Sequence, residues 1–419
     1  MITIVIFRNK EHKLFISTTY RMSYPKSSPI PKGMAEAHLL IPGQGVFLFE
    51  YSGDERNNCS FTIMNKDQSD GILIEWATDG VNVTRANSMV HYTDPKNCKG
   101  LINKSGAFYW FSLDAQHQTL YAGQGEARQE TKVYQYTMPY TTDDERKANK
   151  VFLESLSVVS DFQQVTPLRV LRNPVTQNVP FHVKHEISLD AIAKGLYLCK
   201  AHLSPVSQQM YDCVVDTVLD TDDFPDFSKA VQQSIQDGWC KKQLIKKSNE
   251  FSKSGPPNLA ETYLRITLGD NNGNSPGIPY VMEIWPAGHY SPIHSHANAE
   301  AVIKVLHGSI HVTLFPFLGG DQFLSADFDK DDITWISPDL NQIHQLKNQR
   351  LDDVCITIQC YMYDQKNRTH YDYFDYLDDK NQVQQYEPDS DMDFITFKER
   401  MRMEWENRSP NRLFGCFRA

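Results

Sequence analysis

The sequence contains no apolar run long enough to cross a membrane, and this absence sets the first expectations. The N-terminal run Ile2–Phe7 ends after six residues, where the sequence turns charged. A membrane-spanning helix needs about 20 apolar residues, and the apolar core of a signal peptide needs about 7 to 15. The run therefore predicts a first β-strand. We expect a cytoplasmic protein that makes no contact with membranes.

Paired cysteines and basic patches are also missing. The eight cysteines are scattered and no two form a Cys-x-x-Cys pair, so neither a paired-cysteine zinc motif nor a disulfide framework is predicted. Acidic residues outnumber basic ones by 52 to 42, which leaves a net charge of -10. Because phosphate binding needs a basic face, we expect no nucleic-acid partner.

What the chain does contain is strand-like patterning over residues 1–140. Short runs rich in aromatic and β-branched residues recur there, and Asp79-Gly80 separates two of them as a hairpin turn does. At 419 residues the chain is too long for one ordinary core. We predict a mainly β protein whose first domain, residues 1–140, is a β-sandwich or jelly roll.

The next stretch, residues 141–205, is predicted to be a linker with connecting strands and a helix. Its first part, Thr141–Lys150, is polar and charged throughout. Ser188 is a suitable N-cap for a helix that runs through His202. Apolar residues at helical spacing predict three more helices, at about Phe227–Ile235, Lys241–Phe251 and Phe394–Trp405, with strands between Asn258 and Tyr363.

Three histidines carry the chemistry of the C-terminal half. His294 and His296 lie two residues apart, so on a β-strand their side chains point to the same face. His344 follows about fifty residues later, and on a neighbouring strand it can complete a group of three ring nitrogens. Neutral imidazoles suit Fe, Zn, Cu or Ni. The spacing predicts a metal site made by these three side chains.

The residues around these histidines resemble the two cupin motifs. The positions that carry the resemblance, in chain order, are Gly288, His294, His296, Glu300, Gly308, Pro338, His344 and Asn348. Within the cupins the sequence is similar to the cysteine dioxygenase family over about residues 206–405, with Trp285 and Tyr361 at matching spacings. The resemblance implies a second domain, residues 206–419, built as a cupin barrel with a helical lead-in.

The same resemblance implies an activity. The expected cofactor is Fe(II), and the expected reaction converts L-cysteine, or a similar small thiol acid, with O2 to the sulfinic acid. Tyr361, Arg265 and Tyr263 are the catalytic residues that it implies. Arg265, Tyr263 and Gln359 are the implied substrate-binding residues. An unpaired guanidinium inside a barrel is costly, so we expect a substrate carboxylate to be the partner of Arg265.

Three positions depart from the family pattern or leave it open. Animal cysteine dioxygenases carry, at the position of Ala301, a cysteine that cross-links to the active-site tyrosine, so this cross-link is impossible here. Gln359 replaces a relay histidine and cannot titrate, which leaves the identity of the thiol open. Glu300 has an allowed spacing for a fourth metal ligand, but the alternation along Ala301–Val305 predicts that it faces outward.

Two other functions stay open at this point. One is a non-catalytic scaffold or binding protein whose barrel is stabilised by a metal, and the other is a manganese-dependent cupin that uses Glu300 as a ligand. The first domain resembles the β-sandwich domain of farnesoic acid O-methyltransferase-like proteins through Tyr109–Asp114 and Leu120–Gly125. This resemblance implies a lectin-like or scaffold domain without methyl transfer, and its partner is unknown.

Overall fold

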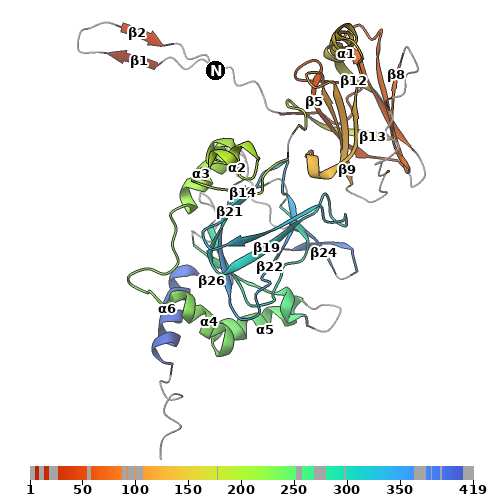
Figure 1. Ribbon diagram of the computed structural model, residues 1–419. Coiled ribbons are helices and arrows are strands. Elements are labelled where there is room, and N and C mark those ends of the chain that lie inside the picture. The colour runs from red at the N-terminus through yellow and green to blue at the C-terminus, as the bar shows by residue number, and fades with distance from the viewer. Residues whose placement is uncertain are drawn as a thin grey trace, which may run out of the picture.

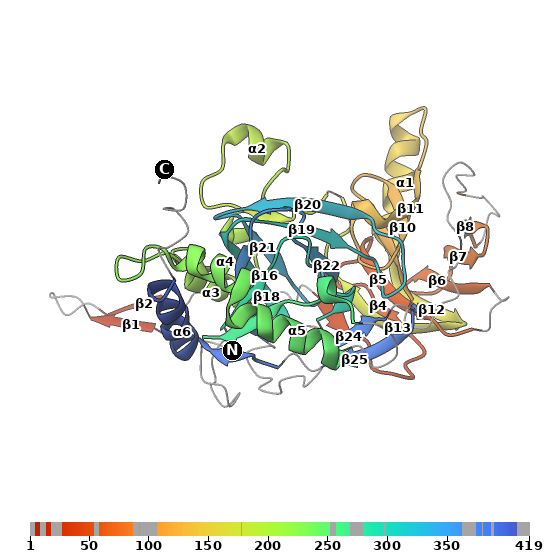
Figure 2. The same cartoon turned by 90° about the horizontal axis from the view of Figure 1, so that it is seen from below.

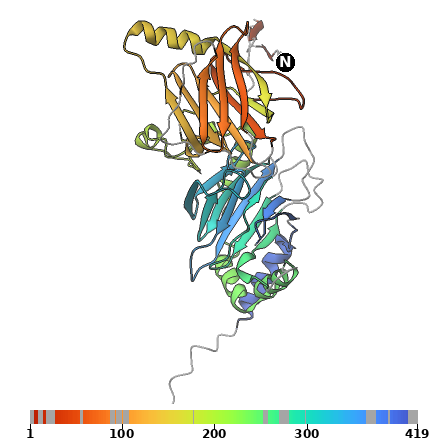
Figure 3. The same cartoon turned by 90° about the vertical axis from the view of Figure 1, so that its right-hand side faces the viewer.

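The structure is a computed structural model in which two β-rich bodies follow each other along the chain (Figure 1). The residues that it describes are 5–8, 14–17, 27–53, 58–86, 92, 100, 107–176, 178–251, 257–268, 280–296, 299–362, 374–378, 380–386 and 389–408. Figure 3 shows the N-terminal body, in orange and yellow, stacked end to end on the C-terminal body, in green and blue.

The N-terminal body is a sandwich of two antiparallel sheets. One sheet has the order β11 (Lys132–Thr137), β10 (Thr119–Gln124), β9 (Phe108–Asp114), β5 (Gln44–Tyr51), β13 (Val165–Leu171) and β3 (Ser27–Pro29). The other has the order β4 (Ala37–His38), β12 (Leu156–Gln163), β6 (Cys59–Asn65), β7 (Gly71–Ala77) and β8 (Gly80–Arg85). A separate hairpin joins β1 (Val5–Arg8) to β2 (Leu14–Ser17). Aromatic rings fill the space between the sheets, with Phe49 in edge contact with Phe61 and Trp76.

The sandwich extends beyond residue 140, where we expected it to end. β12 pairs with β6 and β13 pairs with β5, so strands from the expected linker complete both sheets. The polar stretch Thr141–Lys150 is not a loop either, because most of it belongs to helix α1 (Asp143–Ser155). Thr142 and Glu145 form a capping box at its start. The polar residues are the exposed side of a surface helix, and the linker begins after β13.

The C-terminal body is a barrel of two mainly antiparallel sheets. The larger sheet has the order β14 (His182–Val183), β21 (Ile333–Ile336), β18 (Glu300–His307), β23 (Cys355–Met362), β16 (Tyr280–Trp285), β15 (Leu264–Thr267) and β26 (Met392–Asp393). The smaller has the order β20 (Leu324–Asp329), β19 (Ser309–Leu314), β22 (Ile343–Lys347), β17 (His294–Ser295), β24 (Phe374–Leu377) and β25 (Val383–Tyr386). The predicted fold class is confirmed: the chain is mainly β, a sandwich followed by a barrel.

Helices cover the larger sheet of the barrel, and most of them lie at the end of the barrel away from the sandwich (Figures 1 and 3). They are α3 (Pro205–Val214), α4 (Phe227–Asp237), α5 (Trp239–Phe251) and α6 (Phe394–Glu406), with short 3-10 turns at Lys200–His202 and Leu259–Glu261. A further 3-10 turn, Gln129–Thr131, belongs to the sandwich and lies between β10 and β11. Phe227 and Phe397 are fully buried against the sheet residues Ile266 and Ile284. No helix within the described ranges has the length and apolarity that a bilayer span requires.

Three of the four predicted helices are confirmed, and one is wrong in length. α4, α5 and α6 lie where apolar spacing placed them. The helix expected from Ser188 to His202 is only α2 (Leu189–Ala193), although Ser188 does accept a hydrogen bond from Ala191 N. Gly195 follows with a φ of 61°, a conformation that ends helices.

The two bodies share a packed interface. Phe315, Phe317 and Ile343 of the barrel belong to the same buried cluster as the sandwich core. Gly125 has a φ of 76°, and a Cβ at this position would collide with Pro316. Glycine therefore permits the close approach of the two backbones here. Figure 2, which is seen from below, shows the barrel nearer the viewer and the sandwich, in orange and yellow, behind it and to its right. Because His344 lies on β22, this interface borders the histidine group.

Candidate metal centre

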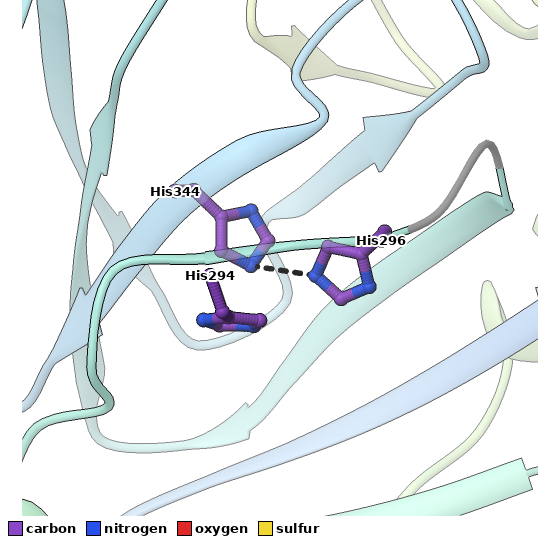
Figure 4. Close-up of side chains that lie close together, drawn as sticks. All are labelled: His294, His296 and His344. Atoms are coloured by element: carbon purple, nitrogen blue, oxygen red, sulfur yellow. Dashed lines mark hydrogen bonds between the residues drawn. The ribbon is translucent and has the colours of Figure 1, made fainter. Parts of the chain in front are cut away.

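The three predicted histidines come together inside the barrel. His294 on β17 and His344 on β22 are register partners in neighbouring strands, and His296 follows β17 directly. One ring nitrogen from each of the three residues lies within 4.8 Å of the others, and Figure 4 shows the rings converging. Nε2 of His296 and Nε2 of His344 are 3.0 Å apart. The alternation of a strand thus places the first and third residues of the motif on one face.

Hydrogen bonding determines which nitrogen of His294 is available. Its Nδ1 lies 3.0 Å from the carbonyl oxygen of Pro292. A carbonyl oxygen can only accept, so Nδ1 carries the proton and Nε2 keeps its lone pair. A backbone carbonyl that orients a ligating imidazole in this way is common in metal sites.

All three imidazoles are neutral at physiological pH. Burial lowers the pKa of His294 to about 4, although the hydrogen bond to Pro292 opposes it. Burial also lowers the pKa of His296 and the pKa of His344 well below the usual value, and the neighbouring histidines add to this effect. Metal ligation needs the neutral form, so the rings are in the protonation state that binds a cation.

The geometry fits a transition-metal ion. Two nitrogens that each lie about 2.1 Å from one ion, at right angles, stand about 3.0 Å apart. The Nε2 atoms of His296 and His344 have this separation. The donor set of three imidazoles suits Fe, Zn, Cu or Ni and leaves the full charge of a divalent ion unneutralised.

A row of polar side chains leads away from the histidines. The ring of Tyr361 stacks on His296, with ring centroids 5.6 Å apart. The Tyr361 hydroxyl donates to Oε1 of Gln359, and Nε2 of Gln359 donates to Oε2 of Glu283. Oε1 of Glu283 lies 3.7 Å from Nε of Arg265. These side chains line the same small cavity as the histidines, and the space open to water inside it is about 20 Å³, about one water molecule.

Arg265 is where it was predicted, but it is not unpaired. Its side chain is 8% exposed and faces the cavity, and the carboxylate beside it belongs to the protein itself, at Glu283. The two residues are cross-strand partners between β15 and β16. We expected a substrate carboxylate to be the partner of Arg265, but the protein itself supplies a carboxylate, that of Glu283. A role for Arg265 in substrate binding stays a prediction.

Glu283 is the residue of the site that sequence reasoning missed. It lies in the run Tyr-Val-Met-Glu-Ile-Trp of β16, where Glu283 and Trp285 share the inward face. A single acidic residue on the inward face of an apolar strand indicates a functional position, and this pattern is visible in the sequence. Burial raises the pKa of Glu283 to about 7, and the positive charges of Arg265 and Lys247 oppose this rise.

Tyr263 also lines the cavity. Its ring stacks on Trp285 with ring centroids 4.1 Å apart. Lys247 donates to the carbonyl oxygen of Tyr263 at 2.9 Å and forms an ion pair with Asp391 at 2.9 Å. Burial raises the pKa of Tyr263 well above the usual value. The phenol of Tyr263 therefore keeps its proton and is a neutral hydrogen-bond donor in the cavity.

Two positions singled out from the sequence lie on opposite sides of β18. Glu300 points outward, where its carboxylate accepts hydrogen bonds from the hydroxyls of Ser204 and Ser207 at the start of α3. It lies outside the histidine group and so is not placed as a fourth ligand. Ala301 points inward and is the register partner of Tyr361, in one buried cluster with it.

Comparison with known proteins adds little to this geometry. No family model matches the sequence. The chain is similar to the cupin domain of Cnp3 from Schizosaccharomyces pombe, with 16% identity over 24% of this chain and 61% of that chain, and a TM-score of 0.20. It is similar to oxalate oxidase in complex with the substrate analogue glycolate, with 16% identity over 26% of this chain and 56% of that chain, and a TM-score of 0.22.

A third solved structure is a sugar phosphate isomerase from a cupin superfamily of Silicibacter pomeroyi, with 14% identity over 33% of this chain and 84% of that chain, and a TM-score of 0.23. The chain spans 61% and 56% of the first two proteins. Likeness at this level carries no argument about activity. What the chain can do chemically therefore has to be argued from its own three histidines and the polar row beside them.

Proposed function

We propose that this chain is an Fe(II)-dependent thiol dioxygenase that converts L-cysteine, or a similar small thiol, to the sulfinic acid. The observation that carries the proposal is a group of three neutral imidazoles, with His296 and His344 buried and His294 half-buried, and with no carboxylate among them, beside an arginine and a tyrosine in one small cavity. A dicationic centre of this kind favours an anionic thiolate as its incoming ligand. The resemblance to cysteine dioxygenases supports the same reading.

His294, His296 and His344 are the residues that would hold the iron. The chemistry that Fe(II) supplies when it is bound is the activation of O2 toward a neighbouring thiolate sulfur. The reaction balances without a further reductant: the O–O bond breaks, two S–O bonds form, and the electrons that sulfur loses are taken up by oxygen. Both oxygen atoms end on sulfur, which is the sulfinic acid level of oxidation.

The protein side chains contribute position and protons. The hydroxyl of Tyr361 lies next to the histidines and donates to Gln359. Its O–H has to turn away from Gln359 to donate a proton to an oxygen bound beside the histidines. Arg265 presents a charged fork to the cavity and can hold a carboxylate. The walls leave little room for bulk water, and a dry cavity strengthens every charge interaction within it.

The direct test is oxygen consumption by iron-loaded protein supplied with L-cysteine. We expect O2 uptake matched by sulfinate, detected by mass spectrometry, at about one iron per chain. His344→Ala should abolish both signals because it removes one of three ligands. Iron-loaded protein that consumes no O2 with any small thiol contradicts the proposal.

One observation favours a second candidate, a metal-stabilised scaffold. The cavity leaves only about 20 Å³ of open space, which suits a structural ion better than an ion that must also receive a substrate. This candidate predicts bound metal, a large loss of stability on metal removal, and no thiol-dependent O2 uptake. The manganese alternative loses its fourth ligand, since Glu300 faces α3.

A further inference from the structure

Glu283 is a buried carboxylate whose hydrogen-bonding capacity is only partly used. Glu283 is only 3% exposed to solvent. Within the described residues its carboxylate accepts one hydrogen bond, from Gln359, and Nε of Arg265 at 3.7 Å from Oε1 is beyond hydrogen-bond distance. A carboxylate can accept about four hydrogen bonds. Glu283 therefore has acceptor sites left, and it lines the cavity that holds the histidines.

The charged protein side chains beside the cavity are already paired with one another before any substrate enters. Arg265 and Glu283 face each other, and the nearby ammonium of Lys247 is matched by Asp391. An incoming carboxylate beside Arg265 would therefore bring a second negative charge close to Glu283. Like charges at about 4 Å repel strongly in a buried site.

An ammonium group on the same substrate removes this conflict. It donates up to three hydrogen bonds, and Glu283 offers the acceptors for them. A mercapto acid without an amine leaves two carboxylates to share one guanidinium. An aminothiol without a carboxylate leaves the Arg265–Glu283 pair intact and still satisfies Glu283.

We propose that Glu283 is a specificity-determining residue that binds the ammonium group of the substrate, so that the site takes small aminothiols and rejects mercapto acids that lack an amine. The inference rests on the proposed function and deepens it by naming the substrate class. The inference also assigns a role to Gln359, which stands where the family has a relay histidine. The amide N–H of Gln359 donates to Glu283 and holds it in place, and the amide oxygen of Gln359 accepts a hydrogen bond from Tyr361.

The test measures binding instead of turnover. The protein is loaded with Co(II), and thiolate binding is followed by the thiolate-to-cobalt absorption band. The probes are 2-aminoethanethiol, L-cysteine and 3-mercaptopropionate, at about pH 8, where Glu283 with a pKa of about 7 is ionised. We expect both amine-bearing probes to bind at least about tenfold more tightly than 3-mercaptopropionate, as a charged hydrogen bond allows.

The Glu283→Gln variant should reverse the order. We expect it to weaken binding of the amine-bearing probes by about 10- to 100-fold and to strengthen binding of 3-mercaptopropionate. The matched control is Glu300→Gln, which changes a carboxylate of the same barrel that faces α3 and should leave the three affinities as they are. Cobalt stoichiometry of each variant shows that its barrel is folded.

The outcomes separate the two proposals. Equal binding of all three probes by the wild-type protein overturns the role of Glu283, and this comparison does not depend on any variant folding. An unchanged order of affinities in folded Glu283→Gln overturns it as well. Absence of binding by every thiol overturns the proposed function and the inference together. In one further outcome, the protein binds the amine-bearing probes selectively but its iron-loaded form consumes no O2 with them. That result supports the role of Glu283 and contradicts the dioxygenase proposal.

Discussion

The backbone N–H of Gln342 in the barrel donates a 2.9 Å hydrogen bond to the carboxylate of Glu126 in the sandwich. Arg128, which is fully buried, pairs with Glu126 and donates to Oδ1 of Asn341 at 2.8 Å. The side chain of Gln342 reaches the carbonyl oxygen of Ala299 at 2.8 Å. Residues 341 and 342 directly precede β22, which carries a histidine of the site, so contacts from the sandwich help to position the candidate metal site.

The first prediction concerns Arg128→Met. The change leaves Glu126 buried without its cation, and we expect a loss of about 3 to 5 kcal/mol in the free energy of unfolding, measured in urea, together with fewer metal ions per chain. The control is Arg169→Met, which breaks a second ion pair between the two bodies, to Asp339. Those side chains are 30% and 36% exposed, so the cost should stay within about 1 kcal/mol. Equal losses in both variants would argue against support by the buried pair.

The second prediction concerns the metal ligands. His344→Ala should lower bound metal from about one ion per chain to nearly none by elemental analysis, because two imidazoles alone hold an ion weakly. His311→Ala is the control, since this ring on β19 bonds to Asp327 outside the group and should leave the metal content unchanged. A variant at His344 that keeps its full metal content would show that the ion binds elsewhere.

The third prediction concerns Ala301, the position opposite Tyr361. Ala301 and Tyr361 are register partners in β18 and β23, and such partners have Cβ atoms about 5 Å apart. Ala301→Cys therefore places a thiol beside the phenol ring. We expect iron and O2 to form a thioether between the two residues, visible as a cross-linked peptide in mass spectra and absent from samples kept free of iron. Finding only the unlinked peptides would mean that the thiol does not reach the ring.

The fourth prediction concerns pH. The pKa of Glu283 is about 7 in the folded protein against 4.5 without burial. Between these values the folded chain keeps a proton that the unfolded chain has lost, so this group makes the folded state less stable as the pH rises. Glu283→Gln removes that dependence. The free energy of unfolding of the metal-free variant, relative to metal-free wild type, should rise by up to about 3 kcal/mol from about pH 4.5 to 7 and then level off. Parallel curves would place the pKa near its ordinary value.

Much of the candidate site could be read from the sequence because its signals are local. Two histidines at a spacing of two must share a strand face, and the alternation through Gln359 and Tyr361 assigns both to the inner face of β23. The capping box of Thr142 and Glu145 was equally local. The polarity of that stretch led instead to a linker, although a surface helix shows the same polarity.

Local patterns determined which residues face the barrel interior, since side-chain alternation is a property of one strand. Tertiary structure alone decided what each of them meets there. Arg265 opposes Glu283 because β15 and β16 pair in one particular register, and Glu126 reaches Gln342 because two separately built bodies pack together. Register and domain contact depend on the burial of whole faces, summed over residues far apart in the chain. No short window of sequence contains that sum, so the pairing of Arg265 with Glu283 in the cavity of the histidines was visible only in the fold.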